Sequence, residues 1–80
     1  MGCKYCPLAD YLRQQSGRLH TMSFSEIEDL VGTLPPSAHT WRAWWANDRS
    51  HVEARDGWLA AGWQVDSVDR DRQTVTFRKE

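Results

Sequence analysis

The sequence predicts one small α+β domain with three to four helices, a short strand and a C-terminal β-hairpin, in a winged-helix-like order. The 80 residues are too few to build two independent hydrophobic cores. Up to Ala61 the apolar residues recur at helical spacing, whereas from Trp63 onward they alternate, as in strands. We therefore expect a single domain over residues 1–80, with residues 1–6 mobile ahead of the first helix.

The first helix is expected over residues 7–15. Pro7 suits an N-terminal turn, where its missing N–H costs nothing, and the apolar residues that follow it recur at i, i+3 and i+4. A Ser-Gly pair then ends the helix. Polar and apolar residues alternate over 18–22, which predicts a brief strand.

A second helix is expected over residues 24–31, because the residues around it supply both of its ends. Ser23 and Glu26 form a capping box, in which each residue satisfies a backbone N–H of the first turn. Gly32 stands where a helix commonly ends in a left-handed residue. The apolar residues between these ends share one helical face.

The third helix is expected over residues 36–47, after a short turn that contains proline. Pro36 cannot continue the preceding helix but is well placed to begin a new one. Trp41, Trp44 and Trp45 follow at i, i+3 and i+4, so a continuous helix would put all three on one face. At this spacing we expect them in the core.

A fourth helix and a hairpin complete the predicted elements. Ser50 and Glu53 form a second capping box before a helix over 51–61, and Gly57 inside it favours a bend, since glycine costs about 1 kcal/mol there relative to alanine. The apolar alternation over 63–79 predicts a hairpin whose tip is charged and therefore solvated.

The order of these elements suggests nucleic-acid binding. In a winged helix, the second and third helices form a helix-turn-helix whose second helix enters the major groove of DNA. Polar residues facing away from the tryptophans would then contact bases or phosphate, and arginines at the hairpin tip would reach flanking phosphate. The predicted nucleic-acid-binding residues, for DNA or RNA, are His39, Thr40, Arg42, Arg49, Arg70 and Arg72.

The charge balance leaves a second interpretation open. Ten Lys and Arg oppose eleven Asp and Glu, so the net charge of −1 gives no general attraction to polyanions. Carboxylates that would repel phosphate lie among the proposed contacts: Asp48, Glu53, Asp56, Asp69 and Asp71. The alternative is a stand-alone protein–protein interaction protein that binds a host protein complex, such as a phage-encoded inhibitor of a host defence complex of the anti-CRISPR type.

The distribution of charge around the tryptophans discriminates between the two interpretations. A continuous positive stripe from Arg42 to Arg72 favours nucleic acid, whereas scattered charges around an exposed tryptophan favour a protein partner. The domain has five tryptophans, so one that is partly exposed beside Arg42 or Arg49 could anchor such a partner. Exposed indoles could also stack on unpaired bases.

No catalytic group, metal or cofactor is predicted. Cys3 and Cys6 have the spacing of half a zinc site, but no second ligand pair is apparent, so two reduced thiols are expected. Asp48, Ser50 and His51 are merely close in sequence and do not define a triad. No segment approaches the roughly 18 apolar residues of a membrane helix or has a signal-peptide pattern. We expect a non-enzymatic cytoplasmic protein with no membrane partner.

A pattern of aromatic, glycine, proline and capping residues runs along the chain. Its segments are Lys4-Tyr5-x-Pro7-Leu8-x-x-Tyr11-Leu12, Phe24-x-Glu26-Ile27-Glu28, Leu34-Pro35-x-Ser37-Ala38, Trp44-Trp45-x-Asn47, His51-x-x-Ala54, Trp58-x-x-Ala61-Gly62-Trp63-x-Val65 and Val75-x-Phe77. In these segments the chain resembles a small prokaryotic domain of unknown function that occurs alone and beside other domains. The resemblance spans nearly the whole chain and carries no established activity. Its polar members Arg42, Asn47 and His51 are informative, although Asn47 can also turn the chain and His51 can satisfy a helix end. The two cysteines depart from the usual pattern.

Overall fold

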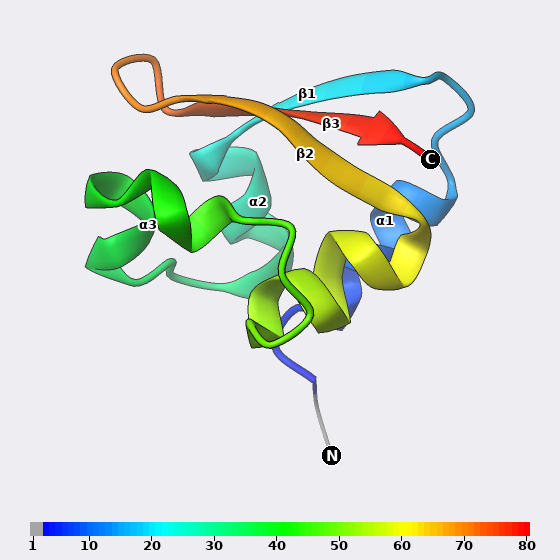
Figure 1. Cartoon of the computed structure of the whole chain (residues 1–80), viewed down its shortest axis with the longest axis horizontal. Helices are drawn as coiled ribbons and strands as arrows, with labels where there is room; N and C mark the ends of the chain where they lie inside the picture. The colour runs from blue at the N-terminus through cyan, green and yellow to red at the C-terminus, as the bar shows by residue number, and fades with distance from the viewer. Residues whose placement is uncertain (1–2) are drawn as a thin grey trace.

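The structure is a computed structural model that describes residues 3–80. Helical segments pack against one face of a three-stranded antiparallel sheet (Figure 1), so the predicted α+β class with a C-terminal hairpin is confirmed. The strands are β1 (Leu19–Ser23), β2 (Trp63–Asp69) and β3 (Thr74–Lys79). The helical segments are α1 (Cys6–Arg13), α2 (Phe24–Val31), α3 (Pro36–Thr40), η1 (Arg42–Trp45), η2 (Ala54–Trp58) and η3 (Leu59–Ala61).

β3 lies at the centre of the sheet, in the order β1-β3-β2. Met22 pairs with Val75, and both side chains are buried on the face that carries the helices. The opposite face is solvated, and there the hydroxyl groups of Thr21 and Thr76 hydrogen-bond across the strands at 2.8 Å. A bulge between Val65 and Ser67 shifts the register of β2 ahead of the hairpin tip.

Large aromatic residues fill the core between the sheet and the helices. Trp45 stacks between Phe24 and Trp58, with ring centroids at 5.0 and 5.8 Å. Trp58 in turn packs against Phe77 of the central strand. Few but large side chains thus bury much apolar area, which compensates for the small size of the domain.

The predicted helix over 36–47 is wrong beyond Thr40. At Trp41 the backbone becomes extended, with φ −113° and ψ 117°, and a 3₁₀ turn follows. This break allows the indole Nε1 of Trp45 to donate a hydrogen bond to the Ala38 carbonyl at 2.9 Å. In a continuous helix these residues would be separated by about 10 Å along the axis. Satisfying the buried indole N–H therefore competes with continuing the helix.

The predicted helix over 51–61 is present but irregular. It widens to a π-helical turn in η2 and tightens to 3₁₀ in η3, with non-helical angles at Gly57, where the sequence favoured a bend. Gly57 packs closely against α1, because an added Cβ would lie 3.5 Å from the Cβ of Tyr5. The second capping box is not formed. The Ser50 hydroxyl donates instead to Asp48, and Glu53 is buried.

The N-terminal segment is packed from Tyr5 onward. Tyr5 is buried in the core, and the Lys4 ammonium donates to the Val31 carbonyl at 3.1 Å. The expectation of reduced thiols is wrong here, because Cys3 and Cys6 form a disulfide across one turn, with Cα atoms 5.2 Å apart. The expected mobility of residues 1–6 includes Met1 and Gly2, which lie outside the described residues.

The described residues contain neither a metal-binding cluster nor a membrane-spanning helix. Within residues 3–80, no three or more His, Cys, Asp or Glu side chains gather closely enough to hold a metal ion together. No helix in the same range combines the length and the apolar character that crossing a membrane requires.

Candidate nucleic-acid interface

The tip of the β2–β3 hairpin lies beside the end of α3 (Figure 1). The connection is a hydrogen bond of 2.7 Å from Arg70 Nη1 to the carbonyl of Thr40. The turn that presents Arg70 is itself fixed, because the Asp69 carboxylate accepts from the Arg72 N–H and the Gln73 carbonyl accepts from Phe24 N–H. Two predicted contact residues, far apart in sequence, are thus brought together.

Trp41 is exposed at the centre of this region. Its side chain is 65 % accessible to solvent, whereas Trp45, one turn later, is buried. The Trp41 backbone is nevertheless held at both ends, since its N–H donates to the Ser37 carbonyl at 2.8 Å and its carbonyl accepts from Trp44 N–H at 3.1 Å. An indole that was expected in the core is therefore displayed on a firm backbone.

Arg42 follows Trp41 and is exposed on η1. Its guanidinium makes no ion pair or hydrogen bond with any other described residue. It lies at a small pocket of about 110 Å³ between η1 and β2, to which Val65 and Val68 contribute apolar walls. Its positive charge is therefore available to a ligand.

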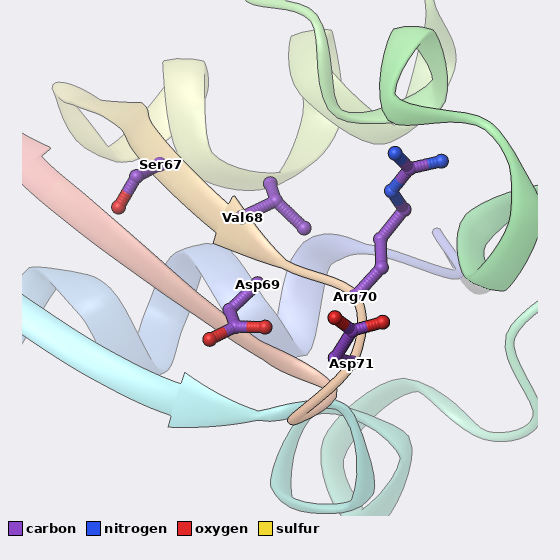
Figure 2. Close-up of a pocket in the computed structure, with 5 residues that line it drawn as sticks. All are labelled: Ser67, Val68, Asp69, Arg70 and Asp71. Atoms are coloured by element: carbon purple, nitrogen blue, oxygen red, sulfur yellow. The ribbon is translucent and has the colours of Figure 1, made fainter.

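Arg70 and the neighbouring carboxylates face different ways. Figure 2 shows Arg70 reaching from the hairpin toward the helical segment beside it, while the Asp69 carboxylate lies on the side of β3. Asp71 lies close to the base of Arg70 in the same view, although the two make no ion pair. Together with Ser67 and Val68, these residues line an open hollow of about 380 Å³. The positive charge of Arg70 is thus only partly offset.

Arg72 occupies the margin of the region. Its side chain is 84 % exposed, and its Nε lies 3.8 Å from the Asp69 carboxylate. Such an exposed pair is weak, so Arg72 can exchange this partner for another anion at little cost. The stripe from Arg42 to Arg72 is thus interrupted by Asp69 and Asp71.

Two of the predicted contact residues, His39 and Arg49, do not belong to the surface around Trp41. The His39 ring packs edge-on against Phe24, with centroids at 5.3 Å, and is half-buried. Arg49 belongs to the loop of residues 46–51, which Figure 1 shows well away from the hairpin tip. We define the Trp41 face as Thr40, Trp41, Arg42 and Arg70, with Arg72 at its margin.

Trp41 was not expected at the surface, because its spacing from Trp44 and Trp45 fits a continuous helix. The only indication was the number of tryptophans, which is large for one small core. Nothing in the sequence singled out Trp41 from the other four.

The polar residue Asn47 has a structural role, and His51 lies beside a buried carboxylate. Asn47 Oδ1 accepts hydrogen bonds from Trp58 Nε1 at 3.0 Å and from Val65 N–H at 2.8 Å, and its Nδ2 donates to the Val65 carbonyl at 3.0 Å. This amide therefore occupies the free edge of β2 and satisfies a buried indole. His51 Nδ1 lies 3.6 Å from the buried Glu53 carboxylate.

The clear pKa shifts lie away from the Trp41 face. Hydrogen bonds from the Ser50 N–H and hydroxyl lower the pKa of Asp48. Burial, and then the charge of Glu53, raises the pKa of the Tyr5 hydroxyl. The hydrogen bond to Asp56, and then the charge of that carboxylate, raises the pKa of Arg55. All three shifts arise from local contacts, and none marks a group prepared for proton transfer.

Comparison with known proteins gives a family whose function is unknown. A family model described as Domain of unknown function (DUF7662) matches residues 5–80, from the buried Tyr5 to the end of the chain. No curated protein and no solved structure matches the chain.

Proposed function

The chain belongs to that family, and we propose that it is a non-enzymatic, regulatory nucleic-acid-binding module that contacts DNA through the Trp41 face. The observation that carries the proposal is the hydrogen bond from Arg70 to the Thr40 carbonyl. Arg70 thus contacts the peptide before the exposed indole of Trp41, and Arg42 follows that indole in the chain. Neither arginine has a carboxylate partner among the described residues, a combination that suits phosphate together with a base.

Each residue of the Trp41 face has a distinct role in this proposal. Arg70 donates one N–H to the Thr40 carbonyl, and its remaining donors can bind a phosphate in a fixed orientation. Arg42 can bind a second phosphate or the acceptor edge of guanine. Arg72, whose side chain is 84 % exposed, adds a weaker phosphate contact at the margin.

The architecture supports the proposal in part. A hairpin beside the third helix is the arrangement by which winged helices contact DNA with a helix and a wing. However, α3 has only five residues, about 7.5 Å of helix, which is too short to follow several bases along a major groove. The contact in our proposal is therefore centred on Trp41 and the arginines rather than on an inserted helix.

Protein binding is the second candidate function, and a specific observation favours it. Asp69 and Asp71 alternate with Arg70 and Arg72 at the hairpin tip, so the surface next to Trp41 carries both signs of charge. An exposed tryptophan among mixed charges is typical of an anchor in a protein interface. In that case the partner would be a protein complex, and the chain would act as an inhibitor or adaptor in the manner of an anti-CRISPR protein.

The test is fluorescence anisotropy with labelled mixed-sequence DNA, single-stranded and duplex, at about 50 and about 200 mM salt. We expect binding that weakens with salt. Arg42→Ala and Arg70→Ala should each weaken it and lower the slope against log salt by about 0.7 on single strands or about 0.9 on duplex, which is the loss of one phosphate contact. Arg49→Ala is the matched control and should leave the slope unchanged.

Two results would reject this function. Absence of binding to both DNA forms at the lower salt would leave the protein-binding candidate in its place. Equal losses for Arg49→Ala and Arg70→Ala would show that binding follows total charge and not the Trp41 face.

A further inference from the structure

We infer that Trp41 is a stacking platform for an unpaired base, so that the preferred ligand is single-stranded nucleic acid and not continuous duplex. This inference rests on the proposed function and specifies the class of nucleic acid. It starts from the exposure of the Trp41 indole, which is 65 %.

Trp41 differs from the other four tryptophans in its surroundings. Trp44, Trp45 and Trp58 form a chain of aromatic contacts, and Trp63 lies under the Lys79 ammonium at 5.8 Å. Trp41 has neither an aromatic neighbour nor a cation over its ring within residues 3–80. A ring without such neighbours can accept a flat partner without first breaking an existing contact.

The backbone under the ring is already ordered. Hydrogen bonds from Trp41 N–H to the Ser37 carbonyl and from Trp44 N–H to the Trp41 carbonyl fix the chain on both sides. Ordering a mobile platform would reduce affinity, because its entropy is lost on binding. Here only the side-chain rotamer of Trp41 remains to be fixed.

The available charge also favours a stacked base. Arg42 and Arg70 are the two arginines of the face without a carboxylate partner, and the whole chain has a net charge of −1. Two phosphate contacts alone give weak binding, since affinity for a polyanion grows with the number of phosphates neutralised. Base stacking supplies a further contribution that does not depend on sequence, because every base has a π-face. In duplex DNA that face is covered by the neighbouring base pairs.

The experiment compares three probes of equal length: oligothymidylate, the same strand with abasic sites in place of its bases, and a duplex. We expect oligothymidylate to bind most tightly and to quench tryptophan fluorescence. Trp41→Ala should weaken its binding by about fivefold or more, whereas Trp41→Phe should retain most of the affinity. The abasic strand should bind the wild-type protein and Trp41→Ala equally, because it offers phosphate only.

The outcomes separate this inference from the function on which it rests. Equal binding of abasic and base-containing strands, with Trp41→Ala unaffected, would overturn the stacking role while nucleic-acid binding stands. Tighter binding to duplex than to oligothymidylate would overturn the single-strand preference. Failure of all three probes to bind at low salt would reject the proposed function itself. Because Trp41 is exposed, its substitution should leave the protein folded, so weaker binding of a variant reflects the lost ring. Circular dichroism of each variant checks that it is folded.

Discussion

Trp41 and Trp45 are four residues apart and have opposite environments. Trp45 is 2 % exposed, stacks on two aromatic rings and donates its indole N–H to the Ala38 carbonyl. Trp41 is 65 % exposed and has no ring partner among the described residues. The same side chain therefore serves the core at one position and the surface at the other.

The difference shows that the hydrogen-bonding needs of the core can decide what the surface displays. The Ala38 carbonyl is available to Trp45 because the helix ends at Thr40. The extended backbone at Trp41, which ends the helix, also turns that residue out of the tryptophan stripe. The backbone break that lets the buried Trp45 indole find its acceptor thus also exposes the indole of Trp41.

The largest expected effect is on stability, from the pair of alanine substitutions. Trp45→Ala removes a buried ring and leaves a cavity, so we expect a loss of about 3 to 5 kcal/mol in the free energy of unfolding. Trp41→Ala should change it by no more than about 0.5 kcal/mol. Urea denaturation followed by circular dichroism measures both. Similar losses in the two variants would show that Trp41 packs in the core in solution.

A smaller effect is expected from Asn47→Ala, which removes the hydrogen-bonding partner of another buried indole. The substitution leaves the Trp58 N–H without its acceptor and opens the edge of β2 at Val65. We expect a loss of about 1 to 3 kcal/mol, the cost of an unsatisfied buried donor. Arg49→Ala, in the same loop, is the control. If the two variants were equally stable, the amide of Asn47 would not support Trp58.

The smallest expected effect is a pH dependence from Tyr5, a buried aromatic residue with a polar atom. Burial raises its pKa above the ordinary value of 10.0, so above that pH the unfolded chain loses a proton that the folded protein retains. Stability from this group is therefore complete below about pH 10 and declines as the pH rises through the folded pKa.

Urea midpoints measured across that alkaline range test the prediction. Tyr5→Phe should flatten the alkaline decline, and Tyr11→Phe is the control because it removes a phenol hydroxyl elsewhere. An undiminished decline in Tyr5→Phe would assign the pH dependence to other groups.

Elements with local start and stop sequences were predicted best. α2 has the predicted bounds, because Ser23 and Glu26 form the capping box and Gly32 takes a positive φ of 87°. The hairpin over 63–79 is likewise present. The second capping box had the same sequence pattern but does not form. The Ser50 hydroxyl donates to Asp48 instead, and the Glu53 side chain is buried. A pattern predicts a cap only where no nearby group competes for it.

The candidate site was predicted only in part. Arg70 contacts Thr40, and Arg42 lies two residues further along the chain. His39 packs on Phe24, and Arg49 belongs to the loop of residues 46–51. These placements depend on the break at Trp41 and on the path of that loop. Neither has a local sequence pattern that could be recognised in advance.

The sequence by itself determined the α+β class, the hairpin and α2, because hydrophobic period and capping residues act over a few neighbouring positions. Only the tertiary structure decided which tryptophan is exposed and that Arg70 lies against Thr40. Such features depend on which groups meet after the chain has packed. Leaving a buried donor such as the Trp45 indole without an acceptor is costly, and that cost can outweigh local helical preference.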